Sequence, residues 1–297
     1  MTEHLSVVFV YGTLREGDSN YHYLKNCVKL FNQARVKGAL YDTGNGYPAY
    51  IDKGDTWVYG ELYAVSPLTL KQLDRLEGYS EGRPDNLYNR VKLLVETDIG
   101  VTEGWIYRLD HQHEKALTNK IHFQDWKVHQ WFYNFSEVKY FAYGSCMDTE
   151  RIEKAGMLTP FSQHVETGKL TGYSMCYTLQ REDGSRADIV ESDDLSSSVE
   201  GIVYTLPKEA IDYLFQREGV YNGSYRATFV NVEINGALHQ DVLTFTVVNK
   251  QAEISPPRHY GIEILRGAKG RLSNNYYEQL LAKLTSLGYE HTIGDDE

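Results

Sequence analysis

The sequence predicts neither a membrane span nor a secretory signal. No apolar run approaches the roughly 18 residues that a helix needs to cross a bilayer. The first residues, Met-Thr-Glu-His, contain no basic segment followed by an apolar one, which is the pattern of a signal peptide. We therefore expect a cytoplasmic protein with no membrane partner.

Cysteine is also scarce, since the chain holds only Cys27, Cys146 and Cys176. Their number is odd and no two form a C-x-x-C pair, so the pattern favours reduced thiols over a disulfide framework. It gives no indication of structural zinc. The segment 267–270, Gly-Ala-Lys-Gly, lacks the G-x-x-x-x-G-K-[ST] spacing of a nucleotide phosphate loop.

Positive charge is limited. Thirty Lys and Arg residues stand against 41 Asp and Glu, which gives a net charge of −11. A broad phosphate-binding surface is not indicated, so we expect a small-molecule partner and no nucleic acid. The length of 297 residues suggests two domains of roughly 150 residues each, and the 41% hydrophobic content suffices for two cores.

One pattern occurs twice in the chain. Residues 8–14 and 139–147 each read as a strand of β-branched and aromatic residues that stops at Tyr-Gly and continues with Thr or Ser. A loop of small and polar residues after a strand leaves backbone N–H groups free to bind an anion. We look for the site at these two loops.

The order of predicted elements repeats as well. In the first half we predict strands over 6–11, 34–40, 56–65, 88–96 and 100–107. We also predict the start of a short helix at 20–24 and a helix over 66–78. In the second half we predict strands over 138–143, within 168–179 and over 199–206. Two helices are predicted there, one that starts at Pro207 and one over 274–287. The acidic end of the chain is expected to be disordered.

The spacing between equivalent residues supports a duplication. The same number of residues separates Gly60 from Glu77 and Gly201 from Glu218. Each glycine lies in a predicted strand, and each glutamate ends a predicted helix just before a glycine. We interpret the chain as two copies of one domain, with residues 1–135 forming the first and residues 136–297 the second.

Glu77 and Glu218 are the candidate catalytic residues. The negative end of the helix dipole disfavours a carboxylate at this position, so burial there would raise its pKa, as a general base at neutral pH requires. A glutamate before a terminal glycine more commonly points into water. Its recurrence in a fixed relation to a strand, a helix and a Tyr-Gly loop favours a functional pair.

The combination of Tyr-Gly loop and Glu-Gly helix end resembles the γ-glutamylcyclotransferase, or AIG2-like, family over nearly the whole chain. The first half is similar to the branch that includes γ-glutamylamine enzymes, through residues 11–17, 47–49, 60–63, 73–79, 88–91 and 124–126. The second half is similar to the branch that acts on γ-glutamyl amino acids, through residues 141–145, 199–201, 217–220, 223–225, and Tyr260, Gly267 and Ala268.

This resemblance implies an α+β fold of two tandem small mixed, mainly antiparallel β-barrels with flanking helices. It also implies an activity. The α-amino group of a γ-glutamyl amine or peptide attacks its own γ-carbonyl, and 5-oxoproline and a free amine result. Such a cyclising acyltransferase or amine lyase requires no cofactor and no metal. The glutamates serve as general acid and base, and the substrate-binding residues are Tyr11, Gly12, Thr13, Leu14, Tyr88, Tyr143, Gly144, Ser145, Cys146, Met147 and Tyr225.

Other hypotheses remain open at this point. Cys146 stands where the family commonly has asparagine, so it is a rival nucleophile, although no histidine is linked to it in sequence and the first copy has Leu14. His111, His113 and His122 suggest a metal site, but solvated residues at a domain edge are the more common case.

The two copies also leave their own roles open. A non-catalytic binding module for γ-glutamyl or other small molecules, with one or both sites inactive, is the alternative function. The two domains could also pair with each other as an intramolecular pseudo-dimer.

Overall fold

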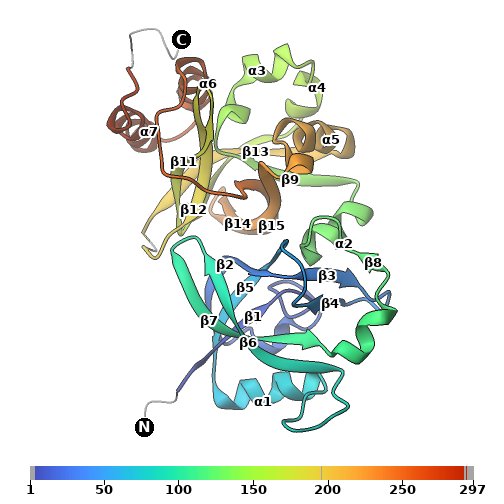
Figure 1. Cartoon of the computed structure of the whole chain (residues 1–297). Helices are drawn as coiled ribbons and strands as arrows, with labels where there is room; N and C mark the ends of the chain where they lie inside the picture. Colours follow the sequence, from blue (N-terminus) through green and yellow to red (C-terminus); the bar gives the residue numbers. More distant parts are fainter. Residues whose placement is uncertain (1–3, 195, 291, 293–297) are drawn as a thin grey trace. The chain divides into compact units, whose positions relative to one another are not determined.

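The computed structural model describes residues 4–194, 196–290 and 292. Contacts divide the chain into two compact units, Met1–Tyr133 and Asn134–Glu297, and each is described by itself (Figure 1). The acidic end that we expect to be disordered, residues 293–297, lies outside the described residues.

The first unit is built around a closed five-stranded barrel. Its strands follow the order β1 (Ser6–Val10), β5 (Trp57–Val65), β2 (Val28–Lys37), β6 (Tyr88–Thr97) and β7 (Gly100–Leu109). Neighbours pair antiparallel, except that β1 and β7 close the barrel in parallel. A small sheet lies beside it, with β3 (Ala39–Asp42), β4 (Pro48–Ile51) and β8 (Asn119–Lys120). Its helices are η1 (Tyr21–Tyr23), α1 (Pro67–Leu76), η2 (His111–Ala116) and α2 (Trp126–Asn134).

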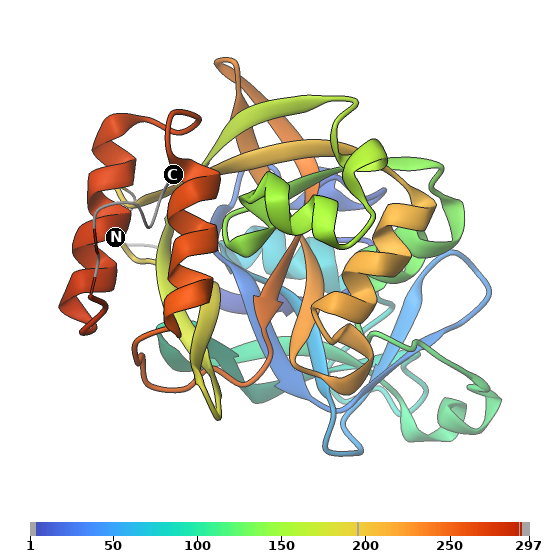
Figure 2. The same cartoon turned by 90° about the horizontal axis from the view of Figure 1, so that it is seen from above.

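The second unit contains an equivalent barrel. Its strands are β9 (Glu137–Ala142), β13 (Ser198–Pro207), β10 (Val165–Thr171), β14 (Tyr225–Ile234) and β15 (Ala237–Val247), with a hairpin of β11 (Tyr173–Arg181) and β12 (Gly184–Glu191) beside them. Its helices are η3 (Ser145–Met147), α3 (Thr149–Lys154), α4 (Leu158–Phe161), α5 (Lys208–Arg217), η4 (Val220–Asn222), α6 (Arg258–Ala268) and α7 (Asn274–Ser286). Helices α6 and α7 lie beside the hairpin, and α3, α4 and α5 lie on the other side of the barrel (Figure 2).

The two barrels have the same topology, which confirms the predicted duplication and the α+β class. Each closes through one parallel pair, Val8 with Trp105 in the first and Leu243 with Tyr140 in the second. Gly60 and Gly201 also occupy equivalent places. A Cβ on Gly60 would lie 2.2 Å from the Val10 carbonyl oxygen, and one on Gly201 would lie 2.4 Å from that of Ala142. Only glycine permits the strands to approach this closely.

The predicted helix after Ser66 is confirmed together with its caps. The Ser66 hydroxyl accepts a hydrogen bond from the Thr69 N–H at 3.1 Å, and Pro67 occupies the first helical position. Leu73 is fully buried. Gly78 follows the helix at a φ of +68°, and Gly219 ends α5 at +62°, the left-handed conformation that glycine adopts without strain.

The predicted strands within 168–179 are confirmed, since β10 and β11 meet there and Gly172 separates them with a φ of +81°. Other elements differ from the prediction. Strand β12 and helices α3, α4 and α6 are not foreseen. Two glycines make the α6 sequence look like a loop, yet both serve close packing, since a Cβ on Gly261 would meet Tyr289 at 2.3 Å and one on Gly267 would meet Met147 at 2.7 Å.

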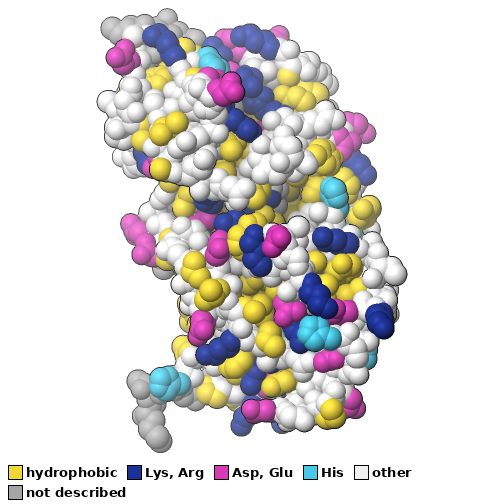
Figure 3. Space-filling view, in the orientation of Figure 1, with side chains coloured by type: hydrophobic (Ala, Val, Ile, Leu, Met, Phe, Trp, Pro, Cys, Tyr) yellow, Lys and Arg dark blue, Asp and Glu magenta, His cyan; other side chains and the backbone are white. Residues whose placement is uncertain are grey.

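Surface properties bear on the expected partners. On the face shown in Figure 3, Lys and Arg side chains are interspersed with Asp and Glu. Across the described ranges, no helix is both long enough and apolar enough to cross a membrane. The expectation that the chain binds no nucleic acid stays a prediction.

Candidate active site

A cavity of about 460 Å³ lies where the loop after β1 meets the end of α1. Its volume is in the range of about 300 to 1,000 Å³ that is typical of small-molecule sites. Its wall brings together every residue that the sequence assigns to the first site, namely Tyr11, Gly12, Thr13, Leu14, Glu77 and Tyr88. The strand, the loop and the helix end therefore converge on one place, although they are far apart in sequence.

Glu77 is the acidic residue in this wall. It caps the C-terminus of α1, and its backbone N–H donates to the carbonyls of Leu73 and Arg75. Burial raises the pKa of its carboxyl to about 7. Within the described part of the chain, no side chain forms an ion pair or hydrogen bond with this carboxylate. Glu77 therefore titrates close to neutrality and is free to exchange a proton with a ligand.

The loop opposite Glu77 exposes backbone donors. Among the described residues, none accepts a hydrogen bond from the N–H groups of Gly12, Thr13 or Leu14. Gly12 is needed because a Cβ there would lie 2.8 Å from the Pro48 ring. The Thr13 hydroxyl is already an acceptor for the Asn20 side-chain amide at 2.9 Å. Three unpaired donors in one turn form an anion-binding concavity.

A buried ionic network holds this loop. Arg15, 3% exposed, donates through Nε to Glu61 at 3.1 Å and through Nη1 to Asp125 at 2.7 Å. Glu61 also accepts from the Glu16 N–H at 2.9 Å and from the Tyr63 hydroxyl at 2.8 Å. Sequence analysis did not assign these residues. The repeat itself gave no signal for them, because Glu61 is replaced by Ile202 in the second copy.

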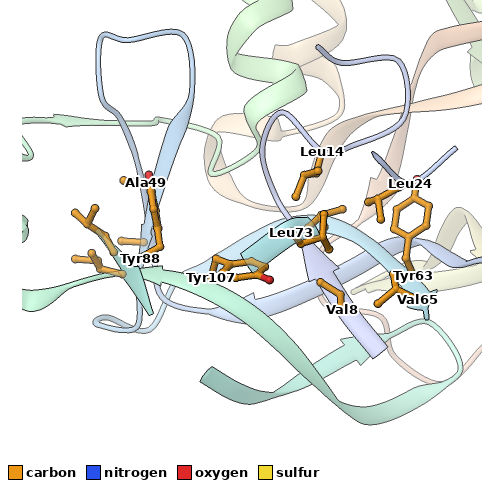
Figure 4. Packing of buried hydrophobic residues seen from close by; sticks show 13 residues of the cluster. Val8, Leu14, Leu24, Ala49, Tyr63, Val65, Leu73, Tyr88 and Tyr107 are labelled. Atoms are coloured by element: carbon orange, nitrogen blue, oxygen red, sulfur yellow. The ribbon is translucent and has the colours of Figure 1, made fainter. Parts of the chain in front are cut away.

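The tyrosines form the walls of the cavity. The Tyr11 hydroxyl donates to the Tyr107 carbonyl at 2.6 Å, and the Tyr88 hydroxyl donates to the Pro48 carbonyl at 3.2 Å. Figure 4 shows Tyr88 and Tyr107 in the buried cluster that also holds Leu14 of the loop and Leu73 of α1. These rings fix the cavity shape, because the hydroxyls of Tyr11 and Tyr88 are bound to the backbone and that of Tyr107 donates to the Asp74 carboxylate at 2.8 Å.

The equivalent place in the second unit is almost filled. Its cavity measures about 20 Å³, the space of about one water molecule. Its wall holds the remaining residues that the sequence assigns, with one exception: Tyr143, Gly144, Ser145, Cys146, Glu218 and Tyr225. Tyr143 and Tyr225 donate to the carbonyls of Phe245 and Ala187, so they match Tyr11 and Tyr88.

Met147 is the exception, and its prediction as a substrate-binding residue is not supported. It is fully buried against α6, where a Cβ on Gly267 would meet it at 2.7 Å. Its carbonyl accepts from Arg271 at 2.6 Å. Met147 therefore anchors the second loop to α6, a helix that the sequence reading did not foresee.

Arg217 contacts three residues in the wall of the second cavity. Its guanidinium donates to the Ser145 hydroxyl at 2.8 Å and to the Cys146 sulfur at 3.1 Å, and lies 3.4 Å from the Glu218 carboxylate. The residue at the same position in the first copy is Leu76, which makes no such contacts. Burial raises the pKa of Glu218, and the neighbouring Arg217 opposes that shift. The Glu218 carboxylate therefore has a charged partner, whereas the Glu77 carboxylate has none among the described residues.

Comparison with known proteins assigns the chain to a family. Residues 8–128 match the family model described as gamma-glutamyl cyclotransferase, AIG2-like, and residues 198–280 match that of the AIG2-like family. YkqA of Bacillus subtilis (strain 168), provisionally named a γ-glutamylcyclotransferase, is 41% identical over 285 residues, which cover 95% of this chain and 98% of YkqA. The chain is a tandem member of the γ-glutamylcyclotransferase family.

Two further comparisons agree with this membership. The crystal structure of YkqA matches with a TM-score of 0.85 and 40% identity over 96% of this chain and 99% of that one. Gamma-L-glutamyl-butirosin B gamma-glutamyl cyclotransferase of Niallia circulans is 40% identical over 124 residues, or 41% of this chain and 76% of the relative.

Cys146 does not resemble an activated nucleophile in this family member. Burial raises the pKa of its thiol, and the opposing effect of Arg217 is smaller. The wall of its cavity contains no histidine among the described residues. A histidine base for a cysteine mechanism is therefore missing from this wall, and the thiol donates instead to the Glu218 carboxylate at 3.5 Å.

The histidines of the first half do not form the suspected cluster. His111 and His113 lie in the short helix η2 rather than on one side of a strand. His111 does group with Asp52 and Glu114, but Glu114 is hydrogen-bonded to Lys53 and Arg108 lies near both carboxylates. Lys53 and Arg108 therefore already supply positive charge to the carboxylates of Asp52 and Glu114. His122 is not part of the group.

Proposed function

We propose that the first half of the chain is a γ-glutamylcyclotransferase, which converts a γ-glutamyl amine into 5-oxoproline and the free amine. The observation that carries this proposal is the unpaired Glu77 carboxylate in a cavity whose opposite wall presents three free N–H groups. The membership of the family supports the reaction class.

The reaction needs the substrate folded onto itself. The α-amino nitrogen forms a bond to the γ-carbonyl carbon, and the bond from that carbon to the leaving amine breaks. Holding the two ends together makes the step unimolecular and removes much of its entropic cost. Tyr88 and Tyr11, fixed by their backbone hydrogen bonds, would enforce the folded conformer.

Charge develops on the γ-carbonyl oxygen during the attack. Donors aimed at such an oxygen contribute about 3 to 4 kcal/mol each to catalysis. The N–H groups of Gly12, Thr13 and Leu14 are the candidates for this role or for binding the substrate α-carboxylate.

Glu77 would transfer the proton. Its carboxylate takes a proton from the α-ammonium group, which frees the nitrogen lone pair, and gives that proton to the nitrogen of the leaving amine. The attacking nitrogen loses a second proton as the lactam forms, and Glu77 passes it to the free amine, which leaves as an ammonium ion. The carboxylate thus returns to its starting state. A pKa of about 7 suits both halves of this exchange at neutral pH.

We propose that the second half does not catalyse this reaction. Its cavity of about 20 Å³ is too small for a γ-glutamyl group, and Arg217 pairs with the carboxylate that would act as base. The second copy then contributes structure or regulation. This corresponds to the alternative given above in which one of the two sites is inactive.

The test compares two matched single variants of the full chain. Purified protein is supplied with a panel of γ-glutamyl amides, and 5-oxoproline is measured by chromatography. We expect Glu77→Gln to lose about 10²-fold or more in kcat/KM and Glu218→Gln to keep the activity. Equal activity of Glu77→Gln and the parent protein would overturn the assignment, and loss in Glu218→Gln alone would place the active site in the second half.

A further inference from the structure

A second cavity adjoins the proposed active site. It measures about 370 Å³ and lies between the loop that joins β3 to β4 and the segment around η2. It shares four wall residues with the cavity of Glu77, namely Asn45, Tyr47, Leu87 and Tyr88. Glu77 and Gly12 to Leu14 line only the first of the two. A substrate with its reacting end at Glu77 can therefore extend past Tyr47 and Tyr88 into this space.

The wall of the second cavity is polar and carries an acid. Its polar side chains come from the end of β3 and the loop after it, and from η2 and the segment after it: Asp42, Thr43, Asn45, His113, Thr118 and Asn119. Of the described residues that line either cavity, none is Lys or Arg. An anionic group on a ligand would therefore contact no lysine or arginine in the wall of either cavity.

Asp42 is fixed in place by neighbouring donors. Its carboxylate accepts from the Gly44 N–H at 2.8 Å, contacts His129 Nε2 at 3.2 Å, and lies 3.5 Å from the Asn119 amide nitrogen. The contact with Asn119 leaves the amide oxygen of that residue as a further acceptor. Asp42 and Asn119 together suit a ligand group that donates hydrogen bonds and carries positive charge.

We propose that this cavity is the subsite for the leaving amine, and that it selects amines with a second ammonium group over amines that carry a carboxylate. The proposal rests on the proposed function, since it places the bond that breaks at Glu77. It separates two substrate classes that share the same γ-glutamyl end: γ-glutamyl amino acids and peptides bring a carboxylate into this space, whereas γ-glutamyl derivatives of diamines bring a cation.

The preference should be measurable but moderate, because several wall residues are exposed. An exposed charge pair contributes up to about 1 kcal/mol, which corresponds to a factor of about 5 in kcat/KM. Attraction of the cation to Asp42 and repulsion of the carboxylate act in the same direction. We therefore expect about 10-fold or more between the cationic and the anionic leaving group.

The test uses three amides whose leaving groups have the same chain length. These are the γ-glutamyl derivatives of 1,4-diaminobutane, butylamine and 4-aminobutyrate. We expect kcat/KM for formation of 5-oxoproline to fall in that order. A preference for the 4-aminobutyrate derivative, or equal values for all three, would overturn the proposal.

A pair of matched variants locates the effect. Asp42→Asn keeps the size of the side chain and should bring the values for the diamine and butylamine derivatives to within about 2-fold of each other. Asp55→Asn removes the same charge from an exposed residue outside both cavities and should leave the preference unchanged. An unaltered preference in Asp42→Asn would contradict the assignment to this cavity.

A binding measurement separates this proposal from the proposed function. If none of the three amides yields 5-oxoproline, the proposed function fails, and the subsite is then tested by calorimetry with free 1,4-diaminobutane. Binding that Ala116→Trp abolishes, in a variant with unchanged thermal unfolding, would support the cavity as a site for amines. No binding to the parent protein, or binding that survives in this variant, would overturn it.

Discussion

Leu76 and Arg217 occupy the same position in the two copies, directly before the glutamate that ends the helix. Leu76 lies in the wall of a cavity of about 460 Å³. Arg217 instead contacts Ser145, Cys146 and Glu218, three residues in the wall of a cavity of about 20 Å³. This substitution between the copies thus changes the charge beside the site. An aliphatic residue leaves the carboxylate free, and a guanidinium pairs with it.

Replacing Arg217 with leucine should open the second site. In a Glu77→Gln background, which blocks turnover at the first site, we expect Arg217→Leu to raise the binding stoichiometry of a γ-glutamyl amine from one to two per chain, measured by calorimetry. Without the guanidinium of Arg217, less positive charge opposes the effect of burial, so the pKa of Glu218 rises further.

The control for this change is Arg181→Leu, which alters an exposed arginine of the same unit, one that donates to Ser224 and not to the site. It should leave the stoichiometry at one. A stoichiometry of one in Arg217→Leu as well would mean that the guanidinium is not what closes the site.

The pH dependence of turnover should report Glu77. The group acts as a base, so its ionised form is required, and burial raises its pKa to about 7. We expect kcat/KM to increase with pH through an apparent pKa near 7, measured with saturating and sub-saturating substrate in separate series. A rising limb centred at the ordinary value of 4.5 would mean that Glu77 is not buried in the working enzyme.

The same residue should make folding stability depend on pH. A carboxyl whose folded pKa exceeds its unfolded value binds its proton more tightly in the folded state, so its contribution is present below pH 4.5 and is lost as pH rises through 7. Glu77→Gln cannot ionise. Between pH 4.5 and 7, the free energy of unfolding of this variant should therefore rise relative to that of the parent protein by up to about 2 kcal/mol. This is less than the full pKa shift would give, because solvent in the open cavity screens the charge.

Denaturation with urea at a series of pH values provides this measurement. Glu81→Gln, a change at an exposed glutamate in the loop after α1, serves as the control and should track the parent protein at every pH. A difference between Glu77→Gln and the parent that does not vary with pH would show that the carboxyl is not the titrating group.

Local sequence signals predict much of the first site and little of what distinguishes the second. Ser66, Pro67 and Gly78 identify both ends of α1, and the end of the helix locates Glu77. The Tyr-Gly pattern locates the donors at Gly12. These features depend on residues that are close in sequence, so their physical causes can be read locally.

The remaining features depend on contacts between distant residues. Arg217 reaches Cys146 and Ser145, which lie 71 and 72 residues away in sequence. Met147 is predicted at the site because it follows the loop, but it packs against Gly267 of α6 and does not line the second cavity. Neither outcome has a local signal.

The network under the first loop should be the strongest polar determinant of that site. Glu61 and Arg15 are both almost completely buried, and removing one partner of a buried pair leaves an uncompensated charge, at a cost of about 3 to 5 kcal/mol. Since Asp125 still pairs with Arg15, we expect Glu61→Gln to lower the free energy of unfolding by about 2 kcal/mol, which is less than that range.

Glu96→Gln provides the matched control, because Glu96 also pairs with an arginine of the same barrel, Arg35, but is 37% exposed. It should cost less than about 1 kcal/mol. In turnover, Glu61→Gln should raise KM for the γ-glutamyl substrate more than it lowers kcat, since it releases the loop that carries Gly12 to Leu14 while Glu77 stays on its helix. Equal effects of the two variants on stability and on KM would show that the loop is held by its own packing and not by this ion pair.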